Sequence, residues 1–362
     1  MALGFFILIW YYLARFIIFN RKESYPISDI KAEAVSIIIC ARNERAFLES
    51  HLPEWLTLDY PDYEVIVMND CSWDGSKDLL EEMEKKYDRL KAHHLDEENL
   101  YQHDKKFPLT LGIKAAKNEV VLLTDADCVP KSKYWIQEML ASYHQPECEL
   151  VIGYGAYQPK PGLLNKMIRF DTFLIALQYF SSTLRSRTYM ATGRNLSYKK
   201  SLFFRNKGFA SHNHIRSGDD DLFINRVANK RNTFIQFSQN SHTLSVPKSS
   251  FSEWINQKRR HVTTAVFYKT GDKLYIGMYF MAQILFFGGM LTSLIFSLQW
   301  IYPILGLFLM KNCIQIIIFK KSMEKLDEKD LFLWVPILEI FLMFFYLMVH
   351  TANLFSKQPK WK

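Results

Sequence analysis

Long apolar runs stand at both ends of the chain and enclose a more polar middle. Residues 1–20, 275–319 and 331–350 are almost entirely apolar, and each run carries one charged side chain. A run of about 20 apolar residues is long enough to cross a bilayer. Residues 275–319 are therefore expected to cross twice, with a turn near residues 299–303, because a buried core helix would be much shorter. The pattern predicts membrane-spanning helices at both ends.

The positive charges beside the first run predict its orientation. Arg15, Arg21 and Lys22 lie at its far end, and no positive side chain precedes it. Because lysine and arginine accumulate on the cytosolic side of membrane segments, the N-terminus is expected outside and the polar middle in the cytosol. A cleaved signal peptide is the rival interpretation, but the sequence has neither its positive start nor a small-residue cleavage site.

The last apolar run permits two interpretations. Two crossings after the middle would return the lysine-rich loop 320–330 to the cytosol, as the same rule requires. If residues 331–350 also crossed, the basic tail 357–362 would be left outside, against the rule. These residues either span the membrane or lie re-entrant or interfacial around Pro336. Glu339 in this run is a functional candidate by its position, although pairing with a lysine or snorkelling explains it more simply.

In the polar middle, short apolar runs of strand length alternate with helical patterns. The expected strands are residues 34–40, 64–68 and 119–124, and the expected helices are residues 46–58, 76–90 and 109–117. Uninterrupted apolar runs are typical of strands buried on both faces of a parallel sheet. The alternation predicts an α/β fold, with a mostly parallel central sheet flanked by helices. Residues 166–190 are also apolar with basic ends, which favours an amphipathic helix on the bilayer over a core helix.

Composition narrows the classes of protein. The chain has 362 residues, a net charge of +8 and 15% aromatic residues, which excludes long disorder and a disulfide-stapled miniprotein. Its five cysteines lack the spacing of a zinc site and lie mostly in apolar runs, so reduced, buried thiols are expected. The excess positive charge lies near the apolar runs, which favours a lipid surface rather than nucleic acid as its partner.

Polar and acidic side chains follow each expected strand, at the edge where such sheets bind ligands. Turn chemistry explains residues 69–76 after the second strand, but it does not explain Asp125 and Asp127 after the third. Two carboxylates in this position repel each other, and a cation between them relieves the repulsion. Carboxylate oxygens suit Mg²⁺ or Mn²⁺, and Mg²⁺ usually joins carboxylates to substrate phosphates.

Six short motifs occur in order between residues 34 and 261. They are ARNE at 41–44, NDCSWDGS at 69–76, TDADC at 124–128, TGRN at 192–195, GDDDL at 218–222 and QKRRH at 257–261. Together they resemble family 2 glycosyltransferases of the GT-A fold, in particular membrane-embedded bacterial enzymes related to processive polysaccharide synthases. The resemblance implies a GT-A nucleotide-sugar transferase fold with transmembrane helices at both ends.

The resemblance also divides the chain into five parts. They are an N-terminal transmembrane helix (1–20), a linker (21–33), a nucleotide-sugar-binding half (34–145), an acceptor-binding half (146–273) and a C-terminal membrane region with two to three spans (274–362).

The resemblance implies donor-binding roles in the first half. Nucleotide-sugar binding is implied for Ala41, Arg42, Glu44, Asp70, Lys105, Lys106 and Asp125. Within this set, Asp70 matches the aspartate that reads the uracil edge, and Asp74 nearby is expected to close the turn. Asp127 matches the direct ligand of a Mg²⁺ or Mn²⁺ ion, which Asp125 supports. His242 could be a more distant ligand, but a core histidine is the simpler interpretation.

The same resemblance implies acceptor-binding roles in the second half. The implied acceptor and diphosphate residues are Gly193, Arg194, Asn195, Gln257, Arg260 and His261. His261 stands where the family has tryptophan, which puts processivity rather than catalysis in question. A basic helix that meets anionic lipid is the alternative explanation of residues 257–261.

The family's general base matches one of two neighbouring aspartates. Gly218 replaces the family's glutamate, so one register selects Asp219 and a shift by one selects Asp220. Asp219 is the preferred choice. A solvated helix start is the alternative for this acidic triple, residues 219–221, since carboxylates favour helix N-termini.

These implications combine into one expected function. The protein is expected to be a membrane-bound inverting glycosyltransferase that moves a sugar from a nucleotide-diphospho-sugar, with a UDP-sugar as the expected donor, to a hydroxyl of a lipid-linked or glycan acceptor. Its expected location is the inner (plasma) membrane, with several spans and the catalytic part in the cytosol. The alternatives are a processive polysaccharide synthase, a non-catalytic nucleotide-binding scaffold and a nucleotidyltransferase. Few crossings and His261 argue against the first, and the intact acidic motifs argue against the second.

Overall fold

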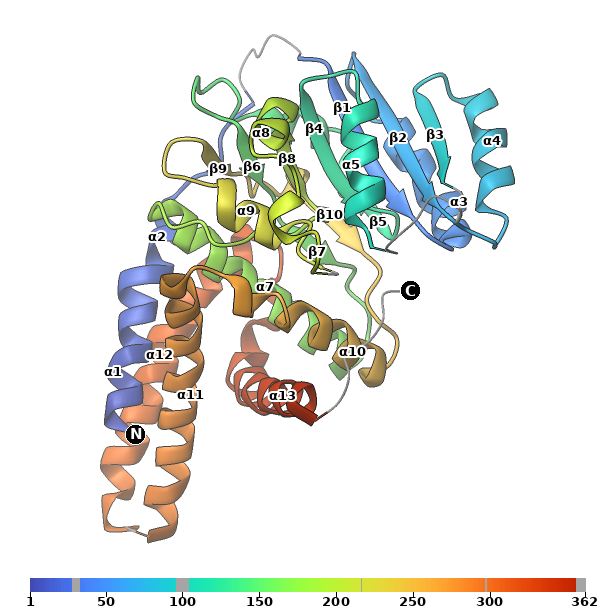
Figure 1. Ribbon diagram of the computed structural model, residues 1–362. Coiled ribbons are helices and arrows are strands. Elements are labelled where there is room, and N and C mark those ends of the chain that lie inside the picture. Colours follow the sequence, from blue (N-terminus) through green and yellow to red (C-terminus); the bar gives the residue numbers. More distant parts are fainter. Residues whose placement is uncertain (28–32, 96–103, 216, 297, 356–362) are drawn as a thin grey trace. The chain divides into compact units, whose positions relative to one another are not determined.

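The computed structural model describes residues 1–27, 33–95, 104–215, 217–296 and 298–355. These residues form two compact units, each built from separate stretches of the chain (Figure 1). The first unit comprises residues 1–23, 159–185 and 248–355, and the second comprises the described parts of residues 24–158 and 186–247. The basic tail 357–362, to which the charge rule was applied, lies outside the described residues.

A central β-sheet organises the second unit. Within the described residues it has seven strands, in the order β3-β2-β1-β4-β8-β6-β9. The strands are β1 (Val35–Ala41), β2 (Tyr63–Asp70), β3 (Leu90–Leu95), β4 (Val120–Asp125), β6 (Leu150–Ile152), β8 (Leu196–Lys199) and β9 (Thr233–Ile235). β1 to β4 are parallel, whereas β8 is antiparallel to β4 and to β6. The three strands expected from the apolar runs are confirmed as β1, β2 and β4, in a mixed but mostly parallel sheet.

Helices and a smaller sheet complete the second unit. The helices are α3 (Arg45–Leu56), α4 (Ser76–Lys86), α5 (Lys106–Ala115), α6 (Trp135–Leu140), α8 (Lys200–Arg205), α9 (Asp221–Val227) and the short turns η3 (Ala210–His212) and η4 (Gln239–Ser241). The smaller sheet has the order β5-β10-β7, formed by β5 (Cys128–Pro130), β10 (Thr243–Ser245) and β7 (Gly155–Tyr157). Because β5 begins directly after Asp127, this sheet fixes the chain just beyond the acidic motif.

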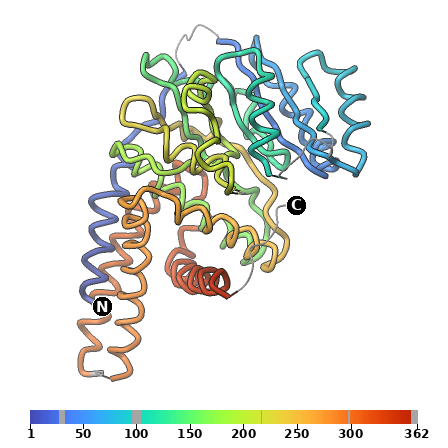
Figure 2. Tube along the Cα trace, in the orientation of Figure 1, coloured from blue at the N-terminus to red at the C-terminus, as the bar shows by residue number. Residues whose placement is uncertain are grey.

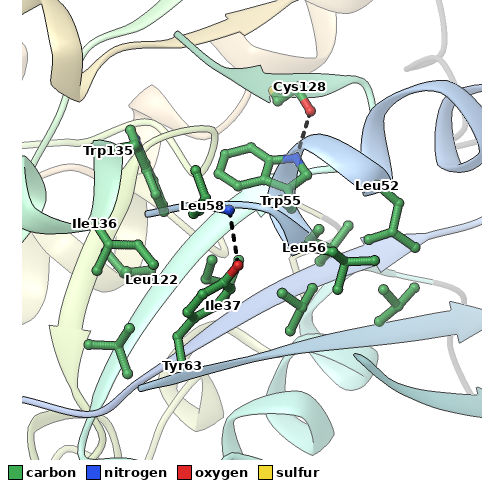
Figure 3. Packing of buried hydrophobic residues seen from close by; sticks show 14 of the residues in the cluster. Ile37, Leu52, Trp55, Leu56, Leu58, Tyr63, Leu122, Cys128, Trp135 and Ile136 are labelled. Carbon is green, nitrogen blue, oxygen red and sulfur yellow. Dashed lines mark hydrogen bonds between the residues drawn. The ribbon is translucent and has the colours of Figure 1, made fainter. Parts of the chain in front are cut away.

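Aromatic side chains fill the core near this point. Trp55 of α3 and Trp135 of α6 are buried and meet edge to face, with ring centroids 4.9 Å apart. Figure 3 shows the Trp55 indole donating a hydrogen bond to the carbonyl oxygen of Cys128 at 2.9 Å. In the same view, the backbone N–H of Leu58 donates to the Tyr63 hydroxyl at 3.0 Å. The core therefore anchors β5, and truncating a buried tryptophan such as Trp55 to alanine would cost about 3–5 kcal/mol.

Apolar helices dominate the first unit. Among the described residues, four helices are long and apolar enough to cross a membrane: Ala2–Arg21, Thr270–Phe296, Ile301–Lys325 and Lys329–Phe355. They consist of α1 (Ala2–Trp10) with η1 (Tyr11–Phe16) and α2 (Ile17–Arg21), of α11 (Thr270–Phe296), of α12 (Ile301–Lys325), and of η7 (Lys329–Trp334) with α13 (Val335–Phe355). The turn η6 (Leu298–Trp300) separates α11 from α12 near the expected position. The unit also contains α7 (Leu163–Leu184), α10 (Phe251–Val262) and the turn η5 (Ala265–Phe267).

A glycine allows α1 and α11 to pack closely. In the trace of Figure 2, α1 (blue) runs beside α11 and α12 (orange). A Cβ atom at Gly4 would lie 2.6 Å from the Ala282 carbonyl oxygen and 2.6 Å from the Phe286 backbone nitrogen, both in α11. Any larger residue would push the two helices apart. Small residues at helix contacts are a common means of tight packing in lipid.

The charged side chains inside the later apolar helices pair with each other. Lys311 of α12 and Glu339 of α13 are buried and form an ion pair. Glu339 also accepts hydrogen bonds from the Tyr12 hydroxyl and from the Gln283 side-chain amide, each at 3.2 Å. The expected pairing of Glu339 with a lysine is confirmed. Three donors from three other helices satisfy this carboxylate inside an apolar bundle.

Candidate active site

The carboxyl ends of β1, β2 and β4 lie at one edge of the large sheet. The strand register pairs Ala41 of β1 with Asn69 of β2, and Cys40 of β1 with Asp125 of β4. Ala41 ends β1, and Glu44 immediately precedes α3. The loops that follow the three strands therefore leave the sheet at the same edge, as the sequence pattern predicted.

Hydrogen bonds tie the loop after β1 to the loop after β2. The Asn43 backbone N–H donates to the Ser72 hydroxyl at 2.9 Å, and the Asn43 side-chain oxygen accepts from the Trp73 backbone N–H at 3.0 Å. Asp74 accepts from the Arg45 backbone N–H at 2.8 Å. Burial alone would raise the pKa of Asp74, but the hydrogen bonds that it accepts lower it below the ordinary value. Asp74 therefore closes this turn, as expected.

A buried aspartate and an arginine stand at the base of these loops. Asp70 is 1% exposed, and its carboxylate lies 3.8 Å from Nη1 of Arg42. The same guanidinium lies over the ring of Trp73, 5.8 Å from its centroid, and Trp73 is 72% exposed. A pocket of about 360 Å³ is lined by Asn69, Cys71, Ser72, Trp73, Lys77, His94 and Leu95. The loops thus offer an aromatic surface, a cation and a carboxylate to a planar ligand.

Asp125 and Asp127 form a small group with Cys128, in which one ligand atom from each residue lies within 4.8 Å of the others. Burial, and then Asp127 and Asp125, raise the pKa of the Cys128 thiol well above its ordinary value. The two carboxylates are therefore the charged donors of the group, and they form a DxD-like pair suited to a hard divalent ion. The sequence indicated only a buried thiol at Cys128, because no cysteine spacing signalled its place beside the acids.

Lys105 connects this acidic group to the acidic triple. Its ammonium group pairs with Asp125 and lies 3.5 Å from the Asp219 carboxylate. Burial alone would lower the pKa of Lys105, but Asp125 and Asp219 raise it well above the ordinary value, so Lys105 is charged. A Cβ atom at Gly193 would lie 3.5 Å from Asp220 and 3.6 Å from the Lys105 ammonium. The Gly193 loop therefore also borders this group.

Lys106, the next residue, has a different position. Its side chain is buried, and its ammonium group pairs with Asp104 at 3.3 Å. It also donates to the carbonyl oxygens of His212, at 3.2 Å, and of Ile215. These contacts hold the segment that precedes the acidic triple. Of the two lysines expected to bind the nucleotide sugar, the structure brings Lys105 among the acids and gives Lys106 a structural position.

The aspartates of the triple differ in their contacts. Asp220 precedes α9, and its carboxylate accepts hydrogen bonds from the backbone N–H groups of Gly193 and Asp221, each at 2.7 Å. Burial, and then Asp219 and Asp221, raise the pKa of Asp220 to about 8. Asp221 is buried in the first turn of α9. Asp220 therefore caps the N-terminus of α9, whereas Asp219 lies beside the Lys105 ammonium group.

The loop of residues 192–195 is fixed by its own side chains. The Arg194 guanidinium lies over the Tyr157 ring, 4.2 Å from its centroid. Asn195 is buried, its amide donates to two backbone carbonyls at 2.9 and 2.7 Å, and its oxygen accepts from the Trp135 indole at 3.3 Å. Asn195 thereby holds the loop from inside the core.

His242 is a core residue. Its side chain is buried, Nε2 lies 3.2 Å from the Phe237 carbonyl oxygen, and its ring meets Tyr154 edge to face with centroids 5.1 Å apart. The group of possible metal ligands at the acidic motif consists of Asp125, Asp127 and Cys128 within the described residues. The simpler interpretation of His242 is confirmed.

The remaining expected site residues lie on α10, in the first unit. Trp254 and Lys258, one turn apart, are buried, whereas His261 is exposed and Gln257 and Arg260 are partly exposed. Spacings of three and four place Gln257, Arg260 and His261 on a shared face of the helix. Lys258 pairs with the buried Asp171 of α7. The sequence had not singled out this pair, because no local pattern links α7 to α10.

The fold and the site define a GT-A-type transferase domain, in which a mostly parallel sheet carries a DxD-like pair at its carboxyl edge. Residues 36–206 match the family model described as Glycosyl transferase family 2. The chain therefore carries a domain of this family.

Curated relatives and a solved structure agree with this assignment. The poly-beta-1,6-N-acetyl-D-glucosamine synthase of Staphylococcus epidermidis is 28% identical over 162 residues, which cover 44% of this chain and 37% of that protein. The dolichyl N-acetyl-alpha-D-glucosaminyl phosphate 3-beta-D-2,3-diacetamido-2,3-dideoxy-beta-D-glucuronosyltransferase of Methanococcus voltae is 25% identical over 179 residues, 48% of this chain and 50% of that protein. The alignments thus span half or less of these relatives. The mannosyltransferase PcManGT from Pyrobaculum calidifontis, solved in complex with GDP-Man and Mn²⁺, shares the fold with a TM-score of 0.62 at 16% identity, over 98% of this chain and 97% of that one.

Proposed function

We propose that the protein is a membrane-bound inverting glycosyltransferase. It transfers a sugar from a nucleotide-diphospho-sugar to a hydroxyl of a lipid-linked or glycan acceptor, at the cytosolic face of the inner (plasma) membrane. The observation that carries the proposal is the meeting of Asp125, Lys105 and Asp219 at the carboxyl edge of the sheet, within a family 2 domain. A metal-motif acid, a cation for a leaving diphosphate and a base are the parts that such a transfer needs.

The loops after β1 and β2 are proposed to bind the nucleotide. Asp70, which lies 3.8 Å from Arg42, would accept the ring N–H of uracil, and the exposed ring of Trp73 offers a stacking surface. Ala41 and Glu44, at the ends of the first loop, would contact the base and ribose. The donor is therefore proposed to be a UDP-sugar.

Asp125 and Asp127 would hold a Mg²⁺ or Mn²⁺ ion. Their carboxylate oxygens lie within 4.8 Å of each other and are hard ligands, which suits either ion. When bound, such an ion would stabilise the negative charge of the diphosphate. The similarly folded PcManGT was solved with GDP-Man and Mn²⁺.

The chain's own groups would act on the acceptor and on the leaving group. Asp219 would take the proton from the acceptor hydroxyl, and the oxygen would attack the anomeric carbon from the face opposite the diphosphate. Lys105 would stabilise the charge on the departing diphosphate. A general base within hydrogen-bond reach typically contributes ~10²–10⁴-fold. A single displacement inverts the anomeric configuration and needs no covalent enzyme intermediate.

The acceptor is proposed to meet two further groups of residues. In the second unit these are Gly193 and Arg194, with Asn195 holding their loop from the core. In the first unit they are Gln257, Arg260 and His261 on the shared face of α10. Four apolar helices in the described residues support a location in the membrane.

The full-length protein, reconstituted in lipid nanodiscs, provides the test. A panel of nucleotide sugars is supplied with and without Mn²⁺, release of nucleoside diphosphate is measured, and the lipid extract is analysed by mass spectrometry. Metal-dependent turnover of one donor, abolished by Asp127→Ala and retained by the exposed helix variant Asp78→Asn, is the expected result. The proposal fails if Asp127→Ala turns over the donor as fast as the unmodified protein.

A further inference from the structure

Both ends of α7 attach to the second unit. The chain passes from residue 158 into α7 and returns at residue 186. The two flanking segments contribute β4 and β8, which pair in one sheet. Because a folded sheet lies on one side of a membrane, both ends of α7 are on that side. A helix that crosses once has its ends on opposite sides, so α7 does not cross.

α7 packs against the C-terminal parts of two apolar helices, the first apolar helix and α12. Phe180 of α7 stacks on Phe19, near the end of the first apolar helix, with ring centroids 5.5 Å apart. Phe173 of α7 meets Phe319 of α12 edge to face, with centroids 5.4 Å apart. Phe319 immediately precedes the lysines of the 320–330 loop. These contacts place α7 at the membrane boundary on the second unit's side.

α10 also stays on this side. It follows the last segment of the second unit, which ends at residue 247. With 12 residues, α10 is about 18 Å long, whereas the hydrocarbon core of a bilayer is about 30 Å thick. The last turn of α10 carries Arg259, Arg260 and His261. A short helix with a basic end belongs at the membrane surface.

α13 runs beside α10 in the same direction. The ring of Phe345 stacks on Trp254 of α10, with centroids 3.9 Å apart and an interplanar angle of 10°. Further along both helices, Nε of Arg259 donates to the side-chain oxygen of Asn353 at 2.9 Å, and the Asn353 amide donates back to the Arg259 carbonyl at 3.1 Å. The C-terminal part of α13 is therefore on the same side of the membrane as α10.

A buried carboxylate joins the three helices. Asp171 of α7 is fully buried and pairs with the Lys258 ammonium group of α10. Asp171 also accepts a hydrogen bond from the Tyr346 hydroxyl of α13 at 2.7 Å. Removing one partner of a buried pair is strongly destabilising, so this arrangement holds α13 firmly against α7 and α10. The other end of α13 is joined to α12 through Glu339 and Lys311.

From these contacts we propose that α13 does not span the membrane, although its length and composition would allow it. It lies within the leaflet that adjoins the second unit, beside α7 and α10. Figure 1 shows the same arrangement inside the first unit: α1, α11 and α12 run side by side, and α13 runs across their direction. The proposal depends on chain connections and helix contacts, and it does not rest on sugar transfer.

The outward face of α13 fits the acyl chains of that leaflet. Ile337, Phe344, Met348 and Phe355 are exposed by 60, 59, 40 and 84%. Their spacing repeats at seven, four and seven residues, which places them along one stripe of a helix. The opposite stripe packs on the protein through Phe345, Tyr346 and Asn353. A helix with one face on protein and an apolar outer face needs lipid as its second neighbour.

The proposal also resolves the conflict over charge that the sequence left open. With α13 in one leaflet, its C-terminal end at Phe355 is on the same side as the lysine-rich loop 320–330. The three lysines of 357–362 follow in the sequence, so the chain is not required to put positive charge on both sides of the membrane, in agreement with the accumulation of positive charge on the cytosolic side. A spanning α13 would separate the two lysine clusters across the membrane.

Sidedness can be measured with three peptide tags on the full-length protein in sealed membrane vesicles of known orientation. One tag follows Lys362, one lies between Pro146 and Glu147 in the second unit, and one lies in the η6 turn. Protease should cleave the first two tags from the same side and the η6 tag from the other. If the tag after Lys362 is cleaved from the same side as the η6 tag, α13 spans the membrane and the proposal is wrong.

Depth provides a second measurement that does not depend on the tags. Nitroxide labels are placed by Ile337→Cys, Phe344→Cys and Phe355→Cys, each in a background whose native cysteines are replaced, and their depth is read from oxygen and nickel-chelate accessibility. Residues 337 and 355 are about 27 Å apart along a helix. Because Glu339 contacts residues near the middle of three membrane-length helices, the label at residue 337 is expected to lie deepest and the label at residue 355 nearest the surface, with residue 344 between them. A depth that is greatest at residue 344 and small at both other positions would show a spanning helix and overturn the proposal.

Discussion

Neighbouring side chains of one type differ in their contacts at the proposed active site. Asp219 lies beside Lys105, whereas Asp220 accepts two backbone N–H groups at the start of α9. The sequence could not choose between them, because both stand after Gly218 and both match the family's base in some register. The two differ because the backbone N–H of Gly193, in a loop distant in sequence, donates a hydrogen bond to Asp220. We therefore expect different consequences when each is altered.

Asp219→Asn should leave the fold intact and reduce kcat by ~10²–10⁴-fold, because proton removal is needed only in the transition state. The dissociation constant for the donor should be retained. Asp220→Asn should instead lower the free energy of unfolding by about 1–3 kcal/mol. Each carboxylate oxygen of Asp220 accepts one backbone N–H, whereas the amide of asparagine has only one oxygen, so one of the two N–H groups loses its acceptor. Calorimetric donor binding, single-turnover rates and thermal unfolding of both variants separate the two effects. If Asp219→Asn keeps full activity while Asp220→Asn is folded and inactive, the base is Asp220.

The pH dependence of stability should reveal the burial of Asp220. Its pKa is about 8 in the folded protein and starts from an ordinary value of 3.8. Between these values the folded state binds more protons than the unfolded state, so this group makes the protein less stable as the pH rises from about 4 to 8. The unmodified protein should lose stability relative to Asp220→Asn across this window and no further above it. Paired thermal-unfolding series at pH 5, 6, 7 and 8 measure the difference, and a constant difference would contradict the raised pKa.

Lys105 and Lys106 form a second matched pair. Lys105→Met should abolish transfer, because its ammonium group lies among the acids of the site, and it should cost less stability than Lys106→Met, because Asp125 and Asp219 remain partly exposed to solvent. Lys106→Met should destabilise the protein by about 3–5 kcal/mol, because it leaves the buried Asp104 without its pair. Turnover and thermal unfolding of both variants distinguish the roles. Equal loss of stability in the two variants would contradict the assignment of a site role to Lys105 and a structural role to Lys106.

At the scale of elements, uninterrupted apolar runs predicted the strands that are buried on both faces. β1, β2 and β4 were found in this way, whereas β3 was not, because the edge strand Leu90–Leu95 is only partly buried and contains Lys91, His93 and His94. The short strands β6, β8 and β9 also gave no signal, since three or four residues carry too little pattern. Their places depend on pairing between distant segments. The antiparallel insertion of β8 beside β4 brings the Gly193 loop to the acidic motif, and no local pattern records it.

The α1–α11 contact leads to a prediction at the same scale. Gly4→Leu should separate the two helices, because a Cβ at this position meets backbone atoms of α11 rather than flexible side chains. Overpacking of this kind costs about 1–3 kcal/mol. The variant should unfold at lower temperature in nanodiscs than the control Leu3→Ala, which alters a 64% exposed side chain of the same helix. Equal unfolding temperatures would show that α1 does not pack on α11 in this way.

At the scale of the whole molecule, the chain alternates between its two units. The proposed donor and base residues belong to the second unit, whereas Gln257, Arg260 and His261 belong to the first. The motif order in the sequence predicted these residues as one set but gave no sign of the division, because membership of a unit depends on contacts between segments far apart in the chain. Transfer therefore needs residues from both units if the proposed acceptor role of α10 is correct.

The adjacent arginines of α10 test that role. Arg259 is bonded to Asn353 of α13, so Arg259→Ala should lower thermal stability, and Asn353→Ala should reproduce the effect. Arg260 lies on the face shared with Gln257 and His261, so Arg260→Ala should reduce transfer at least tenfold, a loss of about 1.4 kcal/mol of transition-state stabilisation, while unfolding remains unchanged. Uridine base and ribose contacts should persist in both variants, because Ala41, Arg42 and Asp70 lie in the other unit; binding of uridine monophosphate measures them. Normal transfer by Arg260→Ala, alongside inactive Asp219→Asn, would mean that the second unit contains the whole catalytic set and that α10 serves only the lipid surface.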